Sequence, residues 1–241
     1  MKIDVRVAVV GGGIVGASVL YWLAKLGWGD AILLERRELT SGSTWHAAGN
    51  TTYFGPYPAM TRLFAGSIRT YLQAENDSGH PVSFHQTGGL RLAATMRELE
   101  LFHLYKERYD ELDIPFYIRS PAETKQLNPL IDTSCIFGAA HTPTDGHVDP
   151  TGATNALAKA ARILGAQVER FRPVDALYQN KDHWVLETEK GNISAQHLVI
   201  AASFWARELL APLGLNLPLY ATQHHELITE DIPQIKEMDR N

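Results

Sequence analysis

The hydrophobic pattern is clearest in the first fifty residues. Residues 5–10 form a short, mostly apolar run, and Gly11, Gly13 and Gly16 follow it with the spacing G-x-G-x-x-G. An almost wholly apolar stretch continues to Gly27, and residues 31–35 form a second apolar run that ends in an acid. Short apolar runs bounded by turn residues favour buried strands, and the longer run between them favours a helix. The pattern predicts a β-strand, helix, β-strand unit.

Further along the chain, apolar residues recur at helical spacing or alternate as in strands. Helices are predicted at residues 59–75, 98–112, 121–127, 151–164 and 204–210. Strands are predicted at residues 82–93, 115–118, 136–141, 167–169, 174–178, 183–187, 193–195, 198–202 and 219–230. Strands that alternate with helices indicate a parallel sheet, so we expect an α/β fold in which residues 167–169 extend the first sheet.

Composition and charge narrow the classes of function. The chain has 45% hydrophobic and 20% charged residues, which is typical of globular proteins, and its net charge of −5 argues against a general nucleic-acid binder. No apolar run approaches the ~20 residues that span a bilayer. Cys135 is the single cysteine, and Met1 to Asp4 show no leader pattern, so we expect a cytoplasmic protein without disulfides. No His, Cys or Asp spacing indicates a metal site.

The first unit has the features of a dinucleotide site. Gly11 permits a tight turn, Gly13 lets a pyrophosphate approach the backbone, and Gly16 lets helix and strand pack closely. The phosphates are expected at the N-terminus of the helix, where backbone N–H groups are free. Glu35 can accept hydrogen bonds from the hydroxyls of an adenosine ribose. The remaining cofactor contacts predicted in this unit are Ile14, Val15 and Arg36.

Residues 41–50 are mostly small and polar and contain glycine, and they lie a short distance beyond the acid that ends the second strand. This segment resembles the flavin-contacting segment of the amine-oxidising FAD enzymes related to D-amino-acid oxidase, most closely the dimethylglycine and sarcosine dehydrogenases. In those enzymes the histidine of a W-H-x-A-G motif binds FAD covalently through the flavin's 8α-methyl carbon, and that residue is His46 here. By this resemblance, the predicted FAD contacts of the segment are Ser43, Thr44, His46, Ala47, Ala48 and Gly49.

The resemblance implies an FAD-binding Rossmann-like domain of the glutathione-reductase type, with part of an antiparallel substrate-binding sheet. The FAD-binding domain is expected at residues 1–80 and 150–215, and the substrate domain at residues 81–149 and 216–241. The backbone of Val174 is expected at the adenine. Related enzymes usually have Ala-Gly after the strand at 198–202, whereas this chain has Ala202-Ser203, a change that we expect to be tolerated near the cofactor.

The implied function is oxidation of a small N-methyl amine such as dimethylglycine or sarcosine, by hydride transfer to the flavin and release of formaldehyde. A protonated amine has no lone pair to support this reaction, so His224 is a candidate to bind or remove the proton. An ordinary strand histidine remains the alternative for His224. Glu226 stands where the related dehydrogenases have a tyrosine of the substrate pocket. The sequence does not indicate the electron acceptor.

A second interpretation is a non-enzymatic member of the same family, such as the regulatory subunit of pyruvate dehydrogenase phosphatase, or an inactive fragment. The replaced tyrosine favours this interpretation, whereas His46 in an intact motif favours catalysis. Related enzymes continue well beyond the equivalent of Glu230. We therefore expect the chain to be part of a longer protein, or to pair with a complementing chain or a second copy of itself.

Overall fold

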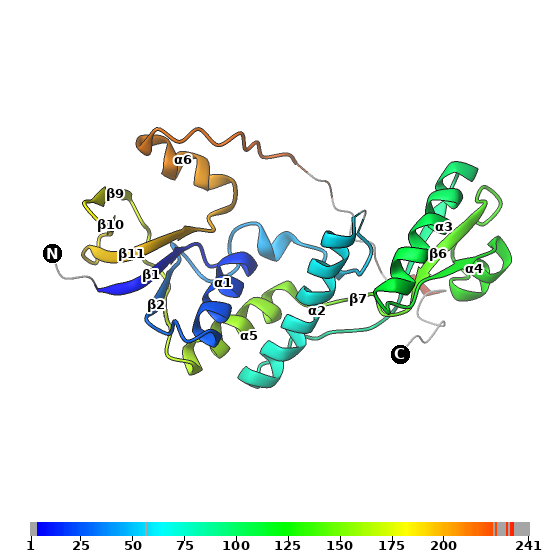
Figure 1. Cartoon of the computed structure of the whole chain (residues 1–241), viewed down its shortest axis with the longest axis horizontal. Helices are drawn as coiled ribbons and strands as arrows, with labels where there is room; N and C mark the ends of the chain where they lie inside the picture. Colours follow the sequence, from blue (N-terminus) through cyan, green and yellow to red (C-terminus); the bar gives the residue numbers. More distant parts are fainter. Residues whose placement is uncertain (1–3, 56, 224, 226–229, 231, 234–241) are drawn as a thin grey trace.

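The computed structural model describes residues 4–55, 57–223, 225, 230, 232 and 233 (Figure 1). Within these residues the larger sheet has six strands in the order β8-β2-β1-β11-β10-β9. Its parallel strands are β1 (Val5–Val10), β2 (Ala31–Leu34), β8 (Gln167–Glu169) and β11 (Ile193–Ile200). Beyond β11 the sheet is extended antiparallel by β10 (His183–Glu187) and β9 (Ala176–Asn180). The α/β prediction is confirmed.

The strand β1 lies in the middle of this sheet because it is apolar on both faces. All of its residues except Arg6 are buried. Val9 pairs with Leu33 of β2 on one side and with Val199 of β11 on the other. A strand buried on both faces is typical of a parallel sheet covered by helices.

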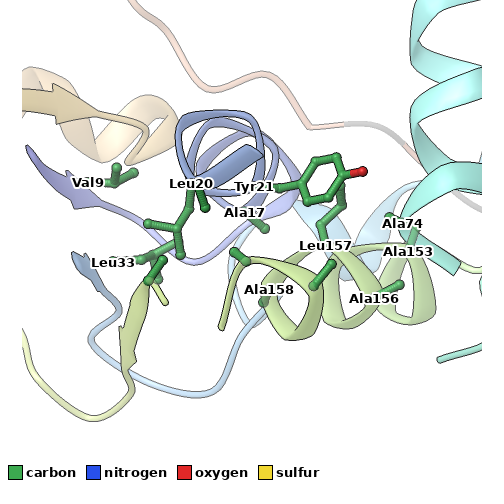
Figure 2. Packing of buried hydrophobic residues seen from close by; sticks show 14 of the residues in the cluster. Val9, Ala17, Leu20, Tyr21, Leu33, Ala74, Ala153, Ala156, Leu157 and Ala158 are labelled. Atoms are coloured by element: carbon green, nitrogen blue, oxygen red, sulfur yellow. The ribbon is translucent and has the colours of Figure 1, made fainter. Parts of the chain in front are cut away.

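The main core lies between this sheet and the helices α1 (Ile14–Lys25) and α5 (Pro150–Ile163) (Figure 2). Leu20 of α1 and Leu33 of β2 are fully buried within it. The side of α5 that faces α1 is built largely from alanine, and such small side chains allow the two helices to pack closely. The long helix α2 (Pro58–Ser78) packs on α5 and contributes the buried Ala74.

A smaller antiparallel sheet lies at the other end of the molecule (Figure 1). Among the described residues its strand order is β4 (Gly89–Ala93), β6 (Gly138–Thr142) and β5 (Tyr117–Arg119). The helices α3 (Met96–Glu111) and α4 (Pro121–Leu127) accompany it. The short pair β3 (Asn50–Thr51) and β7 (Gly146–His147) belongs to the segments that connect the two regions. In this order β6 lies in the centre and pairs antiparallel with both β4 and β5.

Three strand predictions need correction. Only Gly89–Ala93 of the predicted strand 82–93 is a strand, and before it His85 makes an isolated bridge to His147. The strands predicted at 193–195 and 198–202 are one continuous strand, β11, because it pairs with β10 and with β1. Within the predicted strand 219–230, residues 219–223 are described and form no strand. The other predicted helices and strands are present, with ends shifted by a few residues.

Candidate cofactor site

A cavity of about 800 Å³ lies where the parallel strands β1, β2 and β11 end. Its lining comes from the turn after β1, the end of β2, the segment 41–44 and the residues that follow β11. Its volume is in the range of small-molecule and cofactor sites, about 300–1,000 Å³. Open α/β sheets bind nucleotides at this place, beyond the carboxyl ends of the strands.

The turn between β1 and α1 requires glycine. Gly11 has a φ of 115°, and a Cβ there would collide with the carbonyl oxygen of Ala201. At Gly16 a Cβ would collide with the carbonyl oxygen of Gly11, so α1 begins directly against the turn. A Cβ at Gly13 would lie 2.8 Å from the hydroxyl of Thr44. The turn therefore packs closely on two sides and presents bare backbone to the cavity.

Glu35 is fixed at the end of β2. One carboxylate oxygen accepts a hydrogen bond from the backbone N–H of Gly12 at 2.7 Å. The other accepts from the backbone N–H of Arg37 at 2.8 Å. Because Glu35 also lines the cavity, its carboxylate is held where it can accept hydrogen bonds from a ligand.

The segment 41–44 is fastened to both neighbouring elements. The hydroxyl of Thr44 accepts a hydrogen bond from the backbone N–H of Ile14 at 3.0 Å, which satisfies an N–H in the first turn of α1. The hydroxyls of Ser43 and Ser203 lie 3.0 Å apart. Gly42 lies against the indole of Trp205, since a Cβ there would be 3.2 Å from the ring. These contacts place the start of the segment 41–50, which contains the W-H-x-A-G motif, between α1 and the end of β11.

His46 follows in a short 3-10 helix, Thr44–His46. Its ring is exposed and packs on the ring of Trp45, with the centroids 4.0 Å apart. Three residues later, Gly49 has a φ of 75°, and a Cβ there would collide with the carbonyl oxygen of Val148. The segment therefore leaves the cavity after Ala47 and then passes closely against the chain that enters α5.

A buried carboxylate holds the chain beyond this segment. Asp145 accepts hydrogen bonds from the Thr52 hydroxyl at 2.7 Å and from the backbone N–H of Tyr53 at 2.8 Å. The Arg91 guanidinium donates to the same Thr52 hydroxyl at 3.1 Å. Burial raises the pKa of Asp145, against the lowering effect of these hydrogen bonds and of the charge on Arg91. The network joins the smaller sheet to the segment that follows His46.

The structure brings most of the predicted site residues to one cavity. Those that line it are Gly11, Gly13, Ile14, Val15, Glu35, Arg36, Ser43, Thr44, Ala47, Val174 and Ala202. Those outside its lining are Gly16, His46, Ala48 and Gly49. His224 and Glu226 lie outside the described residues. Among the described residues, no group of three or more His, Cys, Asp or Glu side chains is arranged to hold a metal ion.

Trp205 and Ser203 line the cavity and were not among the predicted site residues. The Arg36 guanidinium lies 4.2 Å from the centre of a Trp205 ring, and this contact joins the end of β2 to the residues after β11. The sequence did contain a signal for Trp205. It is an aromatic residue that closely follows an apolar strand predicted to end at the cofactor site. Ser203 was noted only as a replacement for glycine.

The fold and the cavity together define a dinucleotide-binding α/β protein. A family model described as "DAO: FAD dependent oxidoreductase" matches residues 6–241, so the chain belongs to this family. FAD is the family's cofactor. The glycine turn, the fixed carboxylate of Glu35 and the cavity fit the ADP part of such a cofactor.

Three curated relatives show where the chain falls within the family. The chain is 41% identical to dimethylglycine dehydrogenase of Rattus norvegicus over 96% of its length and 27% of the relative. It is 35% identical to sarcosine dehydrogenase of Homo sapiens, over 97% of this chain and 26% of the relative. It is also 34% identical to the pyruvate dehydrogenase phosphatase regulatory subunit of Mus musculus, over 93% and 26%. The chain thus spans about a quarter of the length of these relatives.

The solved structure of L-proline dehydrogenase from P. horikoshii has the same fold. It matches with a TM-score of 0.80 and 29% identity, over 89% of this chain and 57% of that chain. The family resemblance drawn from the motif segment is therefore confirmed by sequence and by fold. In the part of the chain that the structure describes, no helix is both long and apolar enough to cross a membrane.

Proposed function

We propose that this chain binds FAD in the cavity beyond β1 and forms the cofactor-binding part of an enzyme that oxidises a small N-methyl amine of the dimethylglycine or sarcosine type. The observation that carries the proposal is the segment 41–50. Its first residues are fastened between α1 and the end of β11, its residues 41–44 and Ala47 line the cavity, and it contains His46 in a W-H-x-A-G pattern. The names of the two dehydrogenase relatives support the same substrate class.

The residues of the cavity have separate roles in this proposal. Glu35 accepts hydrogen bonds from the ribose of the adenosine, and the N-terminal turn of α1 receives the pyrophosphate. Along the rest of the cavity, the proposed contacts are Ile14, Val15, Arg36, Ser43, Thr44, Ala47, Val174 and Ala202. His46, Ala48 and Gly49 belong to the flavin end, with His46 as the point of covalent attachment.

When bound, FAD supplies a two-electron acceptor for hydride transfer from the N-methyl carbon. The protein must then bind the amine in its neutral form, because only a neutral nitrogen has a lone pair to support the reaction. We assign the removal of the amine proton to His224 and a place in the substrate pocket to Glu226. These two assignments rest on sequence alone, because both residues lie outside the described residues.

The absorption spectrum of the purified protein tests FAD binding. We expect flavin bands in the native protein and flavin fluorescence that stays with the protein after acid denaturation. Turnover of dimethylglycine and of sarcosine is then measured separately with an artificial electron acceptor. A protein that purifies without flavin and does not take up added FAD would refute the proposal at its first step.

A non-enzymatic role is the second candidate, since the regulatory subunit of pyruvate dehydrogenase phosphatase is also a relative. The two candidates differ in one measurement. A regulatory protein could bind FAD yet would not reduce the acceptor with either amine, whereas the dehydrogenase would. Glu226, in place of the tyrosine of the dehydrogenases, is the residue that favours the second candidate, and Glu226→Tyr is the variant that would restore turnover if this position alone is responsible.

We further propose that residues 1–80 and 150–215 form the FAD-binding domain and residues 81–149 and 216–241 form part of the substrate domain. Light scattering would show whether the chain pairs with a second copy or requires a complementing chain.

Cys135 is exposed and unpaired, which suits a reducing compartment, and we propose the cytoplasm. The dehydrogenase relatives are named as mitochondrial, so cell fractionation is the test of location.

A further inference from the structure

A second cavity, of about 380 Å³, lies beside α2 and shares no lining residue with the cofactor cavity. One wall is α2, through Arg62, Ala65 and Arg69. The opposite wall is the loop 112–115 that joins α3 to β5, and the lining is completed by Tyr53 and Thr144. The cavity therefore lies where α2 meets the region of the smaller sheet.

The wall formed by α2 is positively charged. Arg62 and Arg69 are seven residues apart, close to two helical turns, so they project from the same side of α2. Between them Ala65 is buried and small, which leaves space beside the helix. Neither guanidinium forms an ion pair or a hydrogen bond with any described residue. Two unpaired arginines in one cavity stand out in a chain whose net charge is −5.

A buried hydroxyl in the same cavity also lacks a partner. The Thr144 Oγ1 atom is inaccessible to solvent and forms no hydrogen bond within the described residues. A buried hydroxyl without a partner is unfavourable, so Thr144 has a reason to change rotamer when a hydrogen-bond partner is offered. Thr144 also lines the cavity, so a rotation about its Cα–Cβ bond would bring the hydroxyl to a ligand held by the two arginines.

We propose that this cavity is a binding site for a small molecule with an oxyanion group, a carboxylate or a phosphate. The planar guanidinium groups of Arg62 and Arg69 match the paired oxygens of such a group, and the Thr144 hydroxyl adds a neutral donor once its side chain has rotated toward the cavity. Asp113 is the acid of the lining, and its side chain is exposed, so water screens its charge. The arginines are exposed as well, so we expect a dissociation constant on the order of 1 mM.

The test measures binding of two probes, inorganic phosphate and succinate, to the purified chain by calorimetry. Sodium chloride keeps the ionic strength constant, so that general screening cancels. The double variant Arg62→Gln, Arg69→Gln should weaken binding at least tenfold, because each lost charge-assisted hydrogen bond contributes about tenfold. Arg97→Gln is the matched control. It removes the same charge near the first turn of α3, about 20 Å along the helix from the loop 112–115, and should bind like the wild type.

Thr144→Val separates a ligand site from a merely structural cavity. Valine has the same shape without the hydroxyl, so the variant should unfold at the same temperature as the wild type or higher in the absence of anion. It should nevertheless bind the preferred probe several-fold more weakly. Binding of one probe alone identifies the oxyanion as carboxylate or phosphate. No saturable binding to the wild type, or equal binding by the wild type and the double arginine variant, would overturn the proposal.

Discussion

Asp145 offers the sharpest test of how the chain directly after the segment 41–50 is held. Its buried carboxylate accepts hydrogen bonds from the Thr52 hydroxyl and the Tyr53 backbone N–H, and Arg91 donates to the same hydroxyl. Asp145→Ala would leave the Thr52 hydroxyl and the Tyr53 N–H without their acceptor, and the charge of Arg91 without its nearby anion. Removing one partner of a buried charged network costs about 3–5 kcal/mol. We therefore expect the free energy of unfolding to fall by that amount.

Asp145→Asn distinguishes the charge from the shape. The amide keeps one acceptor oxygen in place of two, so one of the two donors loses its partner, and the expected loss is about 1–2 kcal/mol. Urea unfolding followed by tryptophan fluorescence measures both variants against the wild type. If alanine and asparagine destabilise equally and by less than about 1 kcal/mol, the carboxylate does not hold this segment.

The difference in unfolding free energy between the wild type and Asp145→Asn should also change with pH in a definite direction. Burial raises the pKa of Asp145 above its ordinary value of 3.8, so the folded protein binds this proton more tightly than the unfolded chain. The stability that this proton contributes is present at low pH and is lost as the pH rises from about 4 through the folded-state pKa. Asparagine has no such proton. The deficit of Asp145→Asn relative to the wild type should therefore shrink between pH 4 and pH 7, and a deficit that grows would show that Arg91 outweighs burial.

Three further predictions concern the cofactor cavity. Glu35→Gln should weaken FAD binding by about 1.5–3 kcal/mol, and an unchanged affinity in a fluorescence titration would remove Glu35 as the ribose ligand. His46→Ala should abolish flavin fluorescence on a denaturing gel, and complete extraction of the wild-type flavin by acid would contradict covalent attachment. Thr44→Val removes the acceptor for the Ile14 N–H and should lower the free energy of unfolding by about 1 kcal/mol, which chemical denaturation can detect.

The first β-strand, helix, β-strand unit could be predicted almost to the residue because its signals are local. Glycine marks each turn, and the strands are apolar on both faces. The strand β11 was harder because Gln196 and His197 are exposed in its middle, which interrupts the apolar pattern. Its continuity comes from backbone pairing with strands distant in sequence, and that pairing leaves no mark on the side chains.

The predicted strand at 82–93 fails for the opposite reason. Its residues alternate, but before Gly89 the single bridge from His85 to His147 is the only strand-like pairing among the described residues. Alternation describes which side chains could be buried, whereas a strand also needs a neighbour along its length.

The contacts that fasten the segment 41–44 could not be predicted from the sequence either, since Thr44 reaches Ile14 across 30 residues and Ser43 reaches Ser203 across 160.

Ser203 shows how one replacement links the fold to the cofactor. Its φ of 53° lies in the left-handed region, which costs a residue with a side chain about 1–2 kcal/mol and favours the glycine that the family resemblance implies at this position. The hydrogen bond that its hydroxyl makes with Ser43 is exposed, so it offsets about 0.5 kcal/mol at most. Both serines line the cofactor cavity. A bound cofactor would exclude water from this pair and strengthen the bond, so the strain at Ser203 is best balanced when the cavity is filled.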